Sequence, residues 1–113
     1  MFTIFPTRQE KRMLLIFADS VDNAQLIRQQ QILNADVTGL KERDIDVHIY
    51  YADKNADRFR IHKIKTKFTV VLIGKDGGEK LRSTQPFTVK KLYATIDAMP
   101  MRQQEMKHQP KTE

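Results

Sequence analysis

Four short segments of the chain are predicted to be β-strands from the spacing of their apolar residues. Segments 12–18 and 68–74 are continuously apolar, which is typical of strands covered on both faces. Segment 44–51 alternates apolar and polar residues, as in a strand with one wet face, and segment 79–83 is short and charged, as at a sheet edge. The two apolar strands are therefore expected at the centre of a sheet, and the other two at its edges.

The segments between these strands predict helices. Apolar residues recur at helical spacing after a run of capping residues, which predicts one long helix over about 22–43. The polar stretch 52–67 is expected to hold one short helix anchored by Phe59. A last helix is expected to begin after Thr88 as its cap and to end or kink at Pro100.

This order of elements predicts the topology of the sheet. The first two strands are joined by a long helical crossover, so they are expected to be parallel and connected with a right-handed turn. With the apolar strands central, the strand order is 2-1-3-4, with helices on both faces. The predicted fold class is thus α/β with a thioredoxin-like, four-stranded mixed sheet. The whole chain, 1–113, is expected to form a single domain, with flexible ends at about 1–10 and 107–113.

A glycine cluster follows the third predicted strand, and two interpretations of it differ in function. A phosphate-binding loop needs its glycines between a strand and a helix, where backbone N–H groups point at the anion. Gly77 and Gly78 instead lie between two predicted strands, and Asp76-Gly77 is a strong signal for a tight hairpin turn. The cluster therefore predicts a turn rather than a nucleotide site.

Composition excludes several classes of function. The 113 residues contain no cysteine, which excludes a disulfide, a thiol nucleophile and a thiolate metal site. No apolar run reaches the roughly 20 residues of a membrane span, and the three histidines have no ligand spacing, so we expect no membrane span, no metal and no cofactor. The start of the chain has no export signal. We expect a cytoplasmic location if the chain is complete, and the cell envelope or periplasm if a leader has been removed.

Two motifs in the second half of the chain resemble a known family. The stretches FTVVLIGKDGGEKLRS, 68–83, and IDAMPMRQQEM, 96–106, are similar to a bacterial family of small domains, domain of unknown function 4174. That family is itself similar to repeats in animal extracellular sushi-repeat proteins. The resemblance covers about 11–106 and implies a thioredoxin-like fold, but no activity. Relatives often carry export leaders, whereas this chain does not begin with one.

The fold indicates where chemistry would lie. In thioredoxins the reactive cysteine sits just after the first strand, where the helix N-terminus stabilises its thiolate. Here that place is held by Asp19, Ser20, Asp22 and Asn23, and Lys67 stands where thioredoxins keep a cis-proline. These five residues are the candidate binding site, with no catalytic residue among them. The alternative, which the sequence favours, is an ordinary helix-capping cluster.

A basic run offers a second candidate site. The chain has a formal charge of +6, and Arg58, Arg60, Lys63 and Lys65 lie within a single short stretch. Such a run could bind phosphates of a polyanion or nucleic acid, but it is also typical of a solvated connector. Sequence-specific RNA binding would need interleaved aromatic residues, and the sequence suggests only Phe59 and Phe68 nearby, both expected in the core.

These observations together favour a binding protein over an enzyme. We expect a non-redox thioredoxin-like domain that binds a protein partner, itself or another ligand, for which the exposed strand edge at 46–50 and the methionines of the tail provide surface. The alternative is a weak polyanion or nucleic-acid binder acting through the basic run. Nucleic acid is possible but not favoured, and no catalytic constellation is recognisable.

Overall fold

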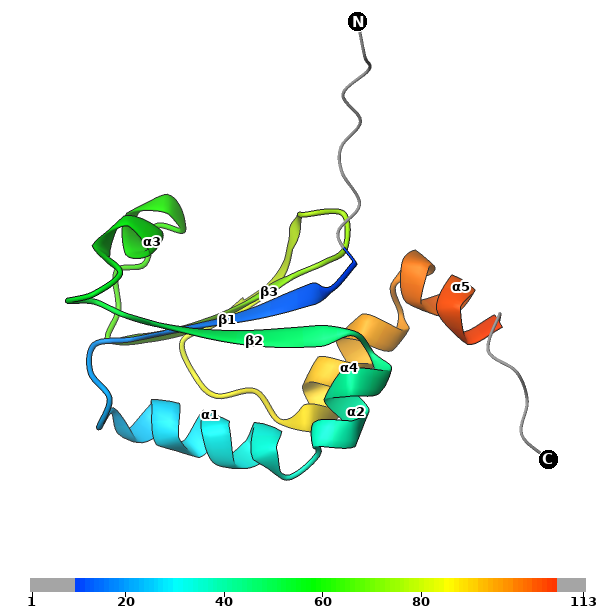
Figure 1. Cartoon of the computed structure of the whole chain (residues 1–113), viewed down its shortest axis with the longest axis horizontal. Coiled ribbons are helices and arrows are strands. Elements are labelled where there is room, and N and C mark those ends of the chain that lie inside the picture. The colour runs from blue at the N-terminus through cyan, green and yellow to red at the C-terminus, as the bar shows by residue number, and fades with distance from the viewer. Residues whose placement is uncertain (1–9, 108–113) are drawn as a thin grey trace, which may run out of the picture.

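The computed structural model describes residues 10–107, which form a four-stranded sheet with helices on both of its faces (Figure 1). The predicted flexible ends lie almost wholly outside the described residues. The strands are β1 (Arg12–Ala18), β2 (Ile45–Tyr51), β3 (Phe68–Ile73) and β4 (Glu79–Ser83). The helices are α1 (Ala24–Asn34), α2 (Val37–Glu42), α3 (Ala56–Ile61), α4 (Val89–Asp97) and α5 (Pro100–Lys107).

The strand order is β2-β1-β3-β4, which confirms the predicted 2-1-3-4 sheet. β1 pairs with β2 in parallel, and with β3 antiparallel, while β3 and β4 form an antiparallel hairpin. Gly77 in the connecting turn has φ +83°, a conformation that glycine adopts without a steric penalty. The glycine cluster is therefore a hairpin turn, as predicted.

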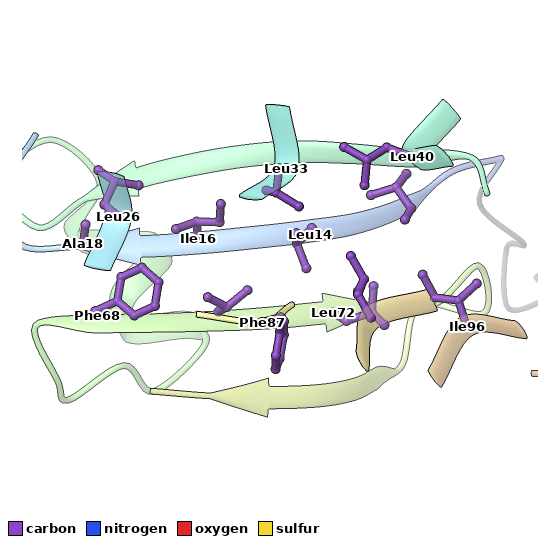
Figure 2. Close-up of a cluster of buried hydrophobic side chains, with 13 residues drawn as sticks. Leu14, Ile16, Ala18, Leu26, Leu33, Leu40, Phe68, Leu72, Phe87 and Ile96 are labelled. Carbon is purple, nitrogen blue, oxygen red and sulfur yellow. The ribbon is translucent and has the colours of Figure 1, made fainter. Parts of the chain in front are cut away.

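The larger core lies on the face of the sheet covered by α1, α2 and α4. Figure 2 shows Leu14, Ile16 and Ala18 of β1 directed toward the same cluster as Leu26 of α1 and Ile96 of α4. All five are fully buried. Because β1 and β3 are continuously apolar, they fill this core with one set of side chains and the opposite face with the other.

The opposite face has a smaller core. Leu15 and Phe17 of β1 and Val71 of β3 are buried there, and Phe59 of α3 packs against them. Phe17 and Phe59 meet edge to face, with ring centroids 5.2 Å apart. The short helix anchored by Phe59 is thus confirmed. Figure 1 shows α3 on the side of the sheet opposite to α1, α2 and α4.

The long helix predicted over 22–43 is wrong, because the structure divides it into α1 and α2. Asp36 begins the second helix, since its carboxylate accepts from the Gly39 backbone N–H at 3.1 Å. The Tyr93 hydroxyl donates to the same carboxylate at 3.0 Å and fixes it against α4. Gly39 is needed here, because a Cβ would lie 2.6 Å from the Tyr93 hydroxyl. The apolar stripe runs through both helices, so periodicity did not reveal the break.

Two features at the end of the chain complete the fold. Thr88 caps α4 as predicted, accepting from the Lys91 backbone N–H at 3.1 Å, and the helix ends before Pro100. Pro100 then begins α5. A proline is favourable at the first position of a helix, because the backbone N–H that it lacks would have no partner within the helix there. The sequence did not predict α5 as a separate helix. No helix within residues 10–107 has the length and apolar character to cross a membrane.

Candidate functional site

The loop between β1 and α1 brings together four of the five predicted site residues. The Asn23 side-chain amide donates to the Asp19 carboxylate at 2.8 Å and to the Lys67 backbone carbonyl at 3.2 Å. The Ser20 hydroxyl donates to the Asp22 carboxylate. Lys67 contributes its carbonyl to this loop, and its side chain is exposed. The loop is therefore joined to the start of β3 by hydrogen bonds.

Much of this polarity serves the helix. The Asn23 side-chain oxygen accepts from the Gln25 and Leu26 backbone N–H groups, at 2.9 and 3.0 Å, so Asn23 is the N-cap of α1. The hydrogen bond from Asn23 lowers the pKa of Asp19 below its usual value, against a small opposing effect of burial. Asp19 and Asp22 are exposed, so both carboxylates remain accessible to a ligand.

An exposed apolar residue stands in the middle of this polar loop. Val21 is 72% exposed, the highest fraction among the large apolar side chains of residues 10–107 that face solvent. Beside it lies a cavity of about 150 Å³ whose wall includes Tyr51, Asp53 and Lys54, from the end of β2 and the turn after it. The sequence did not predict this cavity, because the turn after β2 reaches the loop only through the parallel pairing of β1 and β2.

The basic run lies on the side of the sheet that carries α3. Arg58, Arg60, Lys63 and Lys65 are all exposed, on α3 and the segment that follows it. Phe68 is 1% exposed, which agrees with its predicted place in the core.

Two aromatic residues that the sequence did not connect with this run lie beside it. His48 and Tyr50 on β2 are stacked, with ring centroids 6.5 Å apart and planes at 9°. The Arg58 guanidinium lies 5.8 Å from the centroid of the Tyr50 ring. His48 and Tyr50 are half-buried, so part of each ring faces solvent. Their alternation with apolar residues along β2 is the signal that places them on the α3 side.

A buried network of charges lies at the opposite end of β1, and sequence reasoning missed it. Arg12 is 0% exposed and donates to the Glu105 carboxylate through both terminal nitrogens, each at 3.3 Å. Lys75, 6% exposed, donates to the same carboxylate and to Asp44 at 2.8 Å. Burial would raise the pKa of Glu105, but the hydrogen bonds from Lys75 and Arg12 outweigh it and lower that pKa.

The same network continues along α5. Arg102 is 2% exposed and donates to Asp97 at 3.1 Å and to Glu42 at 2.9 Å. Arg43 donates to the two Asp97 oxygens at 3.1 Å each, and its guanidinium lies 3.8 Å from the Tyr93 ring centroid. Each buried cation thus has a carboxylate, which is the usual condition for burying a charge. Within residues 10–107 no group of three or more acidic or histidine side chains could hold a metal ion.

The fold places the chain in a broad class of proteins. It is similar to thioredoxin-2 of the malaria parasite, described as a component of its protein secretion machinery, with 19% identity and a TM-score of 0.64 over 79% of this chain and 84% of that one. It is also similar to a thioredoxin of Fasciola hepatica, with 13% identity and a TM-score of 0.63 over 81% and 85% of the two chains. A thioredoxin-fold protein of Helicobacter pylori is similar as well, with 13% identity and a TM-score of 0.64 over 90% of this chain and 75% of that one. The chain has a thioredoxin-like fold.

Within that class, the chain belongs to the family called domain of unknown function DUF4174, whose sequence model matches residues 6–105. The predicted family is thus confirmed, while the bacterial origin and the likeness to sushi-repeat proteins stay predictions. No curated protein matches the chain.

Proposed function

We propose that the chain is a thioredoxin-like binding module that acts without redox chemistry and holds a protein partner at the end of the sheet where β1 meets α1. The observation that carries the proposal is the exposed Val21 beside the cavity at Tyr51. A partly exposed aromatic ring and an apolar side chain, surrounded by polar groups, form a small version of the apolar centre and polar rim of protein interfaces.

The charges around Val21 define the kind of partner. Asp19, Asp22 and Asp53 are exposed around it, together with Lys54. The excess of carboxylates favours a segment that carries an apolar side chain next to a basic one. Because Asn23 holds the loop through the cap and through β3, little conformational entropy is lost on binding.

A pair of matched variants tests this proposal. Val21→Asp places a charge in the proposed surface, and Ile61→Asp places the same charge at another exposed apolar residue, 60% exposed and on α3. Partners captured by the tagged wild-type protein from its native source are identified by mass spectrometry, and their affinity is measured with purified components. We expect V21D to weaken binding at least about tenfold and I61D to leave it unchanged, since a buried unpaired charge is costly.

Three results would contradict the proposal. The first is that V21D binds the purified partner as tightly as the wild type, and the second is that I61D alone loses it. The third is reduction of insulin disulfides above background by the pure protein, since the proposed module has no thiol to exchange.

A second candidate function is the binding of single-stranded nucleic acid or another polyanion, which the placement of His48 and Tyr50 beside Arg58 favours. Exposed cations supply phosphate contacts, and partly exposed rings supply stacking surface. Titration of oligonucleotides at several salt concentrations tests it. The double variant Arg60→Ala/Lys65→Ala is compared with a control, Lys41→Ala/Lys90→Ala, whose two residues lie on α2 and α4. If the surface binds phosphates, only the first double variant should reduce the salt slope, by roughly one to two.

A further inference from the structure

A second cavity, of about 530 Å³, lies at the end of β1 opposite to the Val21 loop. It is an open pocket between the β3–β4 turn on one side and the junction of α4 and α5 on the other. Cavities of this size are typical of small-molecule sites, which measure roughly 300–1,000 Å³. The proposed protein-binding surface does not involve this end of the sheet, so a ligand of this cavity would be separate from the partner proposed there.

The wall on the helical side is apolar. Apart from Thr95 of α4, it is made by Ala98, Met99, Pro100 and Met101, at the junction of α4 and α5. Met99 packs against the main core from the same segment. Methionine side chains are flexible and polarisable, so this wall can adapt to an apolar chain of variable shape.

The wall on the sheet side is basic. It includes Arg12, Lys75 and Lys80, against one carboxylate, that of Asp76. Lys75 is held by Asp44 and Glu105 behind the wall.

The other two cations are also paired, but each retains a donor that a ligand could use. Lys80 pairs at 2.7 Å with Asp76, but both side chains are partly exposed, and such pairs contribute little, so Lys80 can exchange this carboxylate for another. Arg12 is fully buried, and its Nε has no hydrogen-bond acceptor among the described residues. A buried donor without an acceptor is rare in folded proteins.

We propose that this cavity binds a small amphipathic carboxylate, with its apolar chain against the methionines and its carboxylate at the basic wall. Lys80, at the exposed side, supplies the charged contact. Arg12, whose charge is paired with Glu105, adds only its unmatched Nε donor in the wall behind it. This arrangement matches the composition of small-molecule sites, which combine mostly apolar walls with a few polar groups that fix orientation.

The experiment uses octanoate as the probe and octanol as its uncharged counterpart, each titrated into the full chain. Binding is followed by calorimetry and by amide chemical shifts. We expect octanoate to bind with one-to-one stoichiometry, to shift residues 95–101, and to bind at least about tenfold more tightly than octanol, because only the carboxylate makes a charge-assisted hydrogen bond.

Three variants localise the site. Ala98→Trp fills the cavity and should abolish octanoate binding, whereas Ala94→Trp, at an exposed residue of α4 outside the wall, should not change it. Lys80→Gln should weaken octanoate about tenfold and leave octanol unchanged. Unfolding of each variant by urea shows that it is folded.

Any of four results would overturn the proposal. These are no binding of octanoate to the wild type, equal binding of octanoate and octanol, equal loss in A98W and A94W, or unchanged octanoate affinity in K80Q. Failure of this proposal would not bear on the protein-binding surface proposed at Val21, because the variants that test that surface lie away from this cavity.

Discussion

Glu105 is predicted to be one of the residues on which the stability of the fold depends most, although it lies in a polar stretch near the end of the chain. Its carboxylate accepts from Arg12 and Lys75, which are 0% and 6% exposed. Replacement of Glu105 by Gln keeps the size of the side chain but places an amide next to two buried cations. The change therefore removes a counter-charge rather than a packing contact.

The size of the effect follows from burial. Removing one partner of a buried ion pair costs roughly 3–5 kcal/mol, because the other charge is left without compensation. Glu105 retains 18% exposure and Lys75 keeps Asp44 at 2.8 Å, so we expect the lower end, about 3 kcal/mol. In a domain of this size that is a large part of a total stability of roughly 5–15 kcal/mol. The corresponding decrease in Tm is roughly 12 °C.

Urea unfolding at pH 7, followed by far-UV circular dichroism, measures this loss. Glu79→Gln is the matched control, because Glu79 also pairs with an arginine, Arg82, but both side chains are well exposed. We expect less than about 1 kcal/mol for that variant. Hydrogen exchange in α5 shows whether the helix detaches before the sheet unfolds. A loss below about 1 kcal/mol for E105Q, with unchanged exchange in α5, would refute the reasoning.

Three further predictions concern the pH dependence of the Glu105 contribution, the buried Gln29 and the half-buried Tyr93. The folded pKa of Glu105 lies below its ordinary value of 4.5, so its contribution to the free energy of unfolding is present above pH 4.5 and is lost as the pH falls through the folded pKa. The difference in stability between wild type and E105Q should therefore narrow below pH 4.5, and a constant difference would contradict this. Gln29 is fully buried, and its side-chain amide forms hydrogen bonds with both backbone groups of Phe87. Gln29→Leu should therefore lower the free energy of unfolding in urea by roughly 2–4 kcal/mol, and Gln31→Leu, at an exposed residue of the same helix, by less than about 0.5 kcal/mol. Equal losses would argue against the importance of these hydrogen bonds. Burial raises the pKa of Tyr93 to about 12, so absorbance at high pH should show an ionisation step near pH 12, and that step should vanish in Tyr93→Phe.

The sheet could be predicted from the sequence because each strand carries its own signal. Continuous apolar runs place β1 and β3 at the centre, and alternation places β2 at the edge. The break between α1 and α2 could not be found in the same way. It depends on Asp36, which caps the second helix and whose carboxylate also accepts from Tyr93, 57 positions later. Contacts across such separations leave no local pattern.

The candidate sites differ in the same way: one could be located from the sequence and the other could not. The Asp19 to Asn23 cluster was found from its position after the first strand, which the sheet order fixes. The buried charge network was missed because Arg12 stands at the start of an otherwise apolar run and Glu105 in an otherwise polar one. Their pairing spans 93 positions of the chain and follows from the docking of α5, a helix that the sequence did not separate from α4.

The contact between Arg12 and Glu105 also determines how this domain can be joined to others. It brings the first strand and the last helix of the fold side by side, and the family match from 6 to 105 contains both residues. A domain whose entrance and exit are adjacent can be inserted into a surface loop of a host protein, or circularly permuted, without stretching its framework. Opening such a permutant at the exposed Gly77 turn would leave the Arg12 and Glu105 contact intact. In contrast, a boundary drawn at the end of α4 would remove Glu105, the carboxylate of Arg12 and one of the two carboxylates that hold Lys75, and would separate the last helix from the strand that it pairs with.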